Sequence, residues 1–121
     1  MRNYKNESAE SMIAREMLEC VWYDNGGLTE RQGQWGKFKR RLMRVFKNMP
    51  KDDYELLFTE REDDTGTMVS FPEWFSIGVD EDTRREFIRE HRSFFKVEMI
   101  LTDWFGEDAS ISIEDYLGET I

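Results

Sequence analysis

The sequence predicts a single, mainly α-helical domain of five to six helices, with at most a minor β-hairpin near residues 55–71. Apolar residues recur at helical spacing in three long segments, and capping or helix-breaking residues bound these segments. Aromatic residues make up 14% of the 121 residues, which is more than a disordered acidic chain carries. The length fits one domain over 1–121, in which we expect residues 1–7 to be flexible.

The first predicted helix covers residues 8–24. Ser8 suits the N-cap, and Met17 and Val21 belong to its apolar stripe. Asn25-Gly26-Gly27 supplies the positive φ that ends a helix.

A second helix is predicted to begin at about residue 30, because Thr29 to Gln32 forms a capping box. Its apolar face runs from Trp35 to Met49. Pro50 ends this helix, and we expect it to open the next one at its first position.

Residues 54–58 are predicted to form a short helix. A strand is the alternative, because Tyr54–Glu60 and Thr67–Phe71 flank Asp63-Asp64-Thr65-Gly66, which suits a hairpin turn. Phe71–Ile77 is predicted to form one or two helical turns begun by Pro72.

The longest helix is predicted from a capping box at Thr83–Glu86 to about Phe105. Phe87, Phe94 and Leu101 recur every seven residues along it. Beyond Gly106, a very short strand at residues 111–113 and a last helical turn at 115–119 are expected.

Charge is unevenly distributed along the chain, whose net charge is −9. Residues 31–51 hold eight basic and no acidic side chains, whereas residues 52–121 hold six basic and twenty acidic ones. The protein therefore offers two oppositely charged surfaces, which bear on its choice of partner.

The acidic half suggests an interaction protein without enzymatic activity, because ordered carboxylates can imitate a phosphate array and occupy a nucleic-acid site on a protein partner. Small acidic inhibitors of restriction or CRISPR nucleases are similar to this chain in size and charge. We therefore expect an inhibitor or regulator of a nucleic-acid-processing enzyme, of the anti-restriction or anti-CRISPR type. Its candidate acidic residues are Glu60, Glu62, Asp63, Asp64, Asp80, Glu81, Asp82, Glu107 and Asp108.

The basic segment 31–47 supports an alternative, direct binding of nucleic acid through phosphate contacts. A competing interpretation is a solvated face that balances the acidic half within the monomer or across a homodimer. The candidate residues are Lys37, Lys39, Arg40, Arg41, Arg44 and Lys47.

A second alternative is a degenerate EF-hand regulatory module. Val69–Phe75 is similar to the end of an EF-hand loop with the start of its exiting helix, and Ile111–Leu117 is similar again 42 residues later. The resemblance implies calcium ligands at loop positions 1, 3, 5, 9 and 12 with glycine at 6. The first loop would supply Glu62, Asp64, Gly66, Ser70 and Glu73, with Thr67 in the glycine position, and the second Trp104, Gly106 and Asp108, with Ala109 there.

No catalytic set and no cofactor site is expected. His91 and Cys20 are the only histidine and cysteine, too few for a zinc site, and nothing in the sequence brings them together as a nucleophilic dyad. No apolar run is long enough for a membrane span, and the N-terminus has no apolar signal core. These features predict a cytoplasmic protein without membrane contact.

Overall fold

The structure is a computed structural model, and it describes residues 7–24 and 34–105. This part of the chain is mainly helical with a small antiparallel sheet, which confirms the predicted fold class. No helix within it is both long and apolar enough to cross a membrane. In chain order the elements are α1 (Ala9–Asp24), α2 (Trp35–Lys47), α3 (Lys51–Leu56), β1 (Glu60–Glu62), β2 (Met68–Ser70), α4 (Phe71–Glu73), the π-helical turn η3 (Trp74–Gly78), α5 (Glu81–Glu90) and α6 (Phe94–Phe105).

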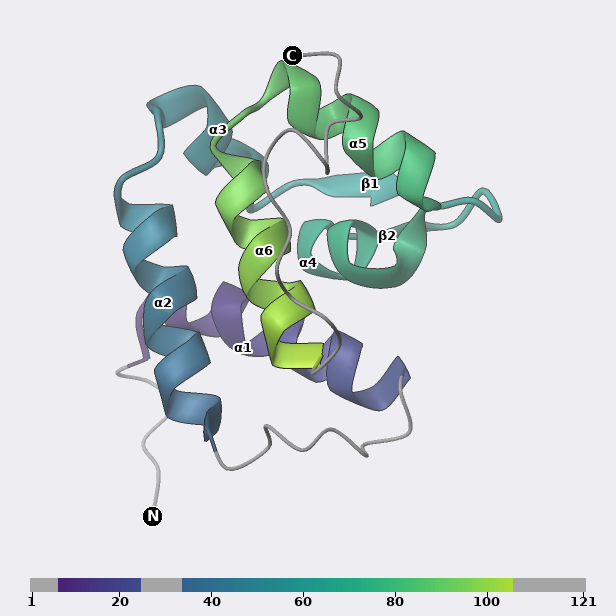
Figure 1. Ribbon diagram of the computed structural model, residues 1–121. Coiled ribbons are helices and arrows are strands. Elements are labelled where there is room, and N and C mark those ends of the chain that lie inside the picture. Colours follow the sequence, from purple (N-terminus) through teal and green to yellow (C-terminus); the bar gives the residue numbers. More distant parts are fainter. Residues whose placement is uncertain (1–6, 25–33, 106–121) are drawn as a thin grey trace.

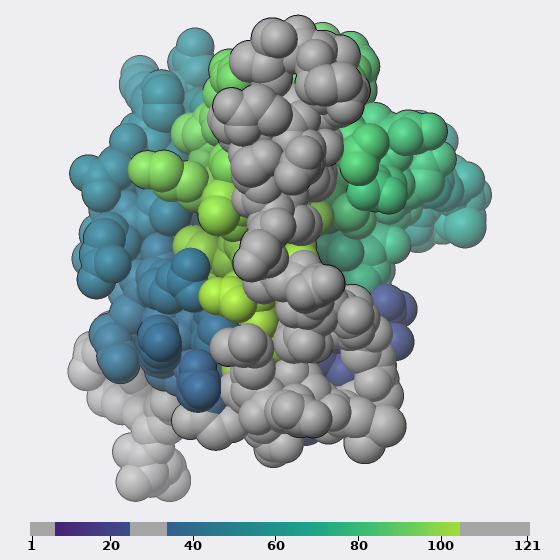
Figure 2. Space-filling view, in the orientation of Figure 1, coloured from purple at the N-terminus to yellow at the C-terminus, as the bar shows by residue number. Residues whose placement is uncertain are grey.

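Helix α1 makes the most widespread contacts, because α2, α6, α4 and η3 all pack against it. In Figure 1, α2 forms the left edge of the molecule, the β1–β2 hairpin and α5 lie on the right, and α6 runs between them. Figure 2 shows the same separation on the surface, with α2 and residues 60–90 on opposite edges. The fold therefore places the basic helix α2 and the acidic hairpin with α5 on opposite sides of α6.

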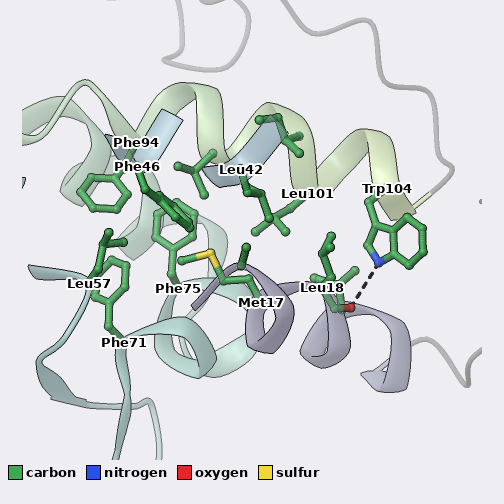
Figure 3. Close-up of a cluster of buried hydrophobic side chains, with 14 of the residues drawn as sticks. Met17, Leu18, Leu42, Phe46, Leu57, Phe71, Phe75, Phe94, Leu101 and Trp104 are labelled. Carbon is green, nitrogen blue, oxygen red and sulfur yellow. Dashed lines mark hydrogen bonds between the residues drawn. The ribbon is translucent and has the colours of Figure 1, made fainter. Parts of the chain in front are cut away.

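The core consists of apolar side chains from the helices and the segment after the hairpin (Figure 3). Phe71 and Phe75 pack there against Phe94 of α6. At the other end, the indole Nε1 of the fully buried Trp104 donates to the Leu18 carbonyl at 3.2 Å. This bond satisfies the polar atom of the largest core side chain, so Trp104 is buried without an unpaired donor.

The start of α1 follows the prediction, because the Ser8 hydroxyl accepts a hydrogen bond from the Ser11 N–H at 3.1 Å. Just before it, the Glu7 carboxylate accepts from Arg15 at 3.2 Å and from Lys39 of α2 at 3.1 Å. Glu7 thus joins α1 to α2. Residues 1–6, the rest of the segment expected to be flexible, lie outside the described residues.

Acid should weaken the protein partly through Glu7. Its hydrogen bond from Arg15 is the main reason why the pKa of Glu7 falls from 4.5 to about 2. A lowered carboxyl pKa contributes stability above the unfolded pKa of 4.5, and this contribution disappears as the pH falls toward 2. Urea unfolding of Glu7→Gln should therefore show lower stability than wild type at pH 7, with the difference shrinking between pH 4.5 and 2.

The control for this experiment is Glu55→Gln, which removes an exposed carboxylate from α3. We expect this variant to follow the wild-type stability profile across the whole pH range. A constant difference between Glu7→Gln and wild type from pH 7 to pH 2 would contradict the role of Glu7.

The minor hairpin expected near residues 55–71 is confirmed, but its first strand covers Glu60–Glu62 rather than Tyr54–Glu60. The predicted short helix forms before it as α3, at Lys51–Leu56 rather than residues 54–58. Glu60 pairs with Ser70 and Glu62 with Met68. The turn between the strands contains Gly66 at φ 84°, a conformation that glycine adopts without strain. Helix α2 ends at Lys47, three residues before Pro50, which occupies the N-cap of α3 rather than its predicted first position.

The single long helix predicted from Thr83 to Phe105 is wrong, because the chain forms two helices there. Helix α5 begins at Glu81, because the Asp80 side chain accepts from the Thr83 N–H at 2.8 Å. The N-cap is therefore Asp80, three residues before the predicted capping residue Thr83. It ends at His91, whose φ of −135° and ψ of 76° are not helical. Asp53 holds this break, because its two carboxylate oxygens lie 2.9 Å from His91 Nδ1 and 2.6 Å from the Ser93 hydroxyl.

Candidate functional site

Three hydrogen bonds to backbone carbonyls fix the hairpin against the segment that follows it. The Trp74 indole donates to the Glu62 carbonyl at 3.1 Å, and the Asp64 N–H donates to the Gly78 carbonyl at 3.0 Å. The Phe71 N–H donates to the Thr59 carbonyl at 2.9 Å. These bonds place the acidic residues of β1 beside the start of α5, although about twenty residues of chain separate the two segments.

Two adjoining hollows lie between the hairpin and α5, and together we call them the acidic groove. Their volumes are about 510 and 400 Å³, and both are lined by Arg61, Trp74 and Thr83. Six carboxylates line the groove against a single guanidinium, so its field is strongly negative. The carboxylates belong to Glu60, Glu62, Asp64, Asp82, Glu86 and Glu90.

Arg61 lies at the centre of the acidic groove. Its guanidinium carbon is 4.3 Å from the Trp74 ring centroid and 5.1 Å from that of Phe87. Its Nε is buried without a hydrogen-bond partner, and among the described residues no carboxylate lies within ion-pair distance of Arg61. Burial lowers the pKa of Arg61, although the group keeps its charge at neutral pH. Arg61 therefore packs on the aromatic rings and pairs with none of the surrounding carboxylates, of which Glu86 forms a surface ion pair with Arg89 at 3.3 Å.

Some of the predicted acidic residues line the acidic groove, and others lie outside it. Glu60, Glu62, Asp64 and Asp82 line the groove, whereas Asp63, Asp80 and Glu81 do not. Glu86 and Glu90 also line it and were missed, although their spacing of four after Asp82 marks one face of a helix. Glu107 and Asp108 lie outside the described residues.

Asp63 and Asp80 hold the backbone. The Asp63 carboxylate accepts from the Thr67 and Thr65 N–H groups, both at 2.9 Å, and the bond from Thr67 is the largest cause of its lowered pKa. The N-cap bond from Thr83 lowers the pKa of Asp80 in the same way. Glu81 forms an exposed ion pair with Arg85 at 2.9 Å.

Two of the predicted basic residues of α2 form ion pairs within the monomer, and the other four are exposed. Lys39 pairs with Glu7 at 3.1 Å and Arg41 with Asp103 at 2.9 Å, so these two balance acidic residues within the monomer. The remaining four are exposed and recur every three or four residues along one stripe of α2, where they face solvent. They are Lys37, Arg40, Arg44 and Lys47.

His91 lies against Asp53, and Cys20 is a half-buried free cysteine of α1. His91 Nδ1 faces Asp53, and Ser93 donates to the same carboxylate, whereas a catalytic serine would bond the histidine. Burial is the main reason why the pKa of Cys20 rises to about 12, so its thiol stays protonated at neutral pH.

The segment expected to resemble an EF-hand loop forms the hairpin instead. Of its candidate ligands, Glu62 and Ser70 lie on the two strands, and Glu73 lies in α4. The other two, Asp64 and Gly66, lie in the turn. The Ser70 hydroxyl caps α4 by accepting from the Glu73 N–H at 3.3 Å. Within residues 7–24 and 34–105, no three His, Cys, Asp or Glu side chains converge as a metal site requires. Most of the second candidate loop lies outside this part of the chain.

Comparison of the chain with known proteins gave no match to a family model, to a curated protein or to a solved structure.

Proposed function

We propose that this protein acts in the cytoplasm by binding a protein partner, without catalysing a reaction. The acidic groove would occupy the cationic, nucleic-acid-binding surface of that partner. The protein would thereby inhibit or regulate a nucleic-acid-processing enzyme. The observation that carries this proposal is the meeting of two acidic segments around one groove, with six carboxylates and one guanidinium among its lining residues.

The geometry suits such a role in two respects. The groove is built on a hairpin fixed by the Trp74 and Asp64 hydrogen bonds and on one face of α5, so its carboxylates require little ordering when a partner binds. Clustered charge of one sign also steers an oppositely charged partner and raises its association rate by about 10- to 1,000-fold at low salt. Rigid, closely spaced carboxylates are what a phosphate-binding surface would accept in place of a nucleic-acid backbone.

The test compares two triple variants that change the net charge equally. The groove variant carries Glu62→Gln, Glu86→Gln and Glu90→Gln, and the control carries Glu19→Gln, Asp52→Asn and Glu55→Gln outside the groove. Tagged wild type and both variants are used for affinity capture from a nuclease-treated lysate of the native cells. We expect wild type and the control to retain one basic protein at stoichiometric level and the groove variant to lose it.

A competition assay then addresses the mode of action. Nucleic acid should displace wild-type protein from the purified partner, and the association rate of the two proteins should fall as salt increases. Equal capture by all three proteins would contradict a role of the acidic groove. Simultaneous binding of nucleic acid and this protein to the partner would contradict phosphate imitation.

A further inference from the structure

A second groove lies between the C-terminal half of α2 and the start of α6. Its volume is about 340 Å³, within the range of ligand sites. In Figure 1, α2 lies beside α6, on the side of α6 that faces away from the hairpin. We call it the basic groove, and its lining residues are Arg44, Val45, Asn48, Arg92, Ser93, Phe95 and Lys96.

Three cations from separate parts of the chain line the basic groove. Arg44 comes from the exposed stripe of α2, Arg92 from the break before α6, and Lys96 from the first turn of α6. All three are exposed, and none has an ion-pair partner among the residues that the structure describes. The Asp53 carboxylate nearby is already bonded to His91 and Ser93. The groove therefore has uncompensated positive charge, which favours an anionic occupant.

The lining of the basic groove also includes apolar surface. Val45 and Phe95 line it between the cations, and Phe95 is 8% exposed. Asn48 stands at the end of α2, where its Nδ2 donates to the Arg44 carbonyl at 2.8 Å. Its second N–H and its carbonyl oxygen are the donor and acceptor types that a base edge uses.

We propose that the basic groove binds single-stranded nucleic acid. Phosphates contact Arg44, Arg92 and Lys96, and one base lies against the half-buried Val45 at the apolar part of the groove. A single strand fits better than a duplex because its unstacked bases can cover apolar surface, whereas a duplex presents its phosphates and keeps its bases stacked. The strand continues along the exposed cations of α2, Arg40 and Lys47, which extend the positive surface beyond the groove. This inference does not depend on the acidic groove.

The experiment measures fluorescence anisotropy of labelled 12-nucleotide single strands across a salt series. Each phosphate contact contributes about −0.7 to the slope of log K against log[salt], so the three contacts within the groove contribute about −2 to the wild-type slope. The groove variant Arg92→Ala/Lys96→Ala should therefore bind weakly and with a shallow slope. Both side chains are exposed, so the variant should keep the wild-type circular dichroism spectrum and melting curve.

Two further probes separate the parts of the proposal. Lys51→Ala removes a cation that is 85% exposed and outside the groove, and it should bind as wild type does. An abasic strand of equal length should bind about tenfold more weakly than the normal strand, because it offers no base to the apolar surface. Absence of binding at low salt would overturn the proposal, as would equal losses in Lys51→Ala and Arg92→Ala/Lys96→Ala. Equal affinity for the abasic strand, or tighter binding of a duplex, would overturn the role of the base.

Discussion

Replacing Phe71 by alanine should lower the free energy of unfolding by about 3–5 kcal/mol. Phe71 is fully buried, and its ring centroid lies 5.3 Å from that of Phe94 and 5.7 Å from that of Phe75. It follows β2 directly and its ring packs against α6, so the cavity would open where the hairpin, η3 and α6 meet. Packing on three sides leaves little freedom for the cavity to collapse, which makes such substitutions costly.

Urea unfolding followed by circular dichroism measures this loss. The matched control is Phe58→Ala, because the Phe58 side chain is 49% exposed and its removal leaves no closed cavity. We expect the control to lose about 1 kcal/mol or less. Equal losses in the two variants would show that Phe71 is not a central core residue.

Replacing Arg84 by methionine should cost about 3–5 kcal/mol, because it removes one partner of a buried ion pair. The Arg84 guanidinium donates to the carbonyls of Phe75 at 2.6 Å and of Val79 at 3.3 Å, and its Nε lies 3.8 Å from Glu98. The side chains of Arg84 and Glu98 are only 13% and 15% exposed. Without Arg84, the buried Glu98 carboxylate would lose its cationic partner, and the carbonyls of Phe75 and Val79 would lose their donor.

The loss from Arg84→Met should depend on pH. Burial is the main reason why the pKa of Glu98 is raised, and removing Arg84 removes the nearest charge that opposes this effect. A raised carboxyl pKa favours the folded state at low pH and loses that contribution as the pH rises through the folded pKa. The destabilisation should therefore be larger at pH 8 than at pH 5.

The double variant Arg84→Met/Glu98→Leu should recover part of the stability, because it no longer buries an unpaired charge. Arg89→Met serves as the control, since Arg89 is 39% exposed and its pairing with Glu86 is a surface ion pair. Chemical unfolding of all four proteins at both pH values would complete the comparison. A pH-independent loss in Arg84→Met, or no recovery in the double variant, would contradict this account.

Local signals predicted several of the helix ends and the hairpin turn, because they act over a few residues. Ser8 caps α1, Pro50 separates α2 from α3, and the turn after Glu62 closes the hairpin. The break at His91 could not be found in this way. It depends on Asp53, which is 38 residues away in the chain and meets His91 only after folding.

The same distinction applies to the candidate sites. The acidic residues of the hairpin were evident in the sequence, but their meeting with α5 depends on the Trp74 and Asp64 hydrogen bonds. For the basic groove, the spacing of four between Arg92 and Lys96 is the spacing of neighbours on one face of a helix. Residues 91–93 are not helical, however, so this spacing does not locate Arg92. Their position beside Arg44 follows from the packing of α6 on α2.

The charges of β1 have a consequence for solubility. A two-stranded ribbon has exposed backbone edges, to which a strand of another molecule can add, and charged side chains on an edge strand discourage this addition. All three residues of β1, Glu60, Arg61 and Glu62, are charged. The carboxylates proposed to recognise a partner thus also protect the ribbon against aggregation, and neutralising all of them would remove both properties together.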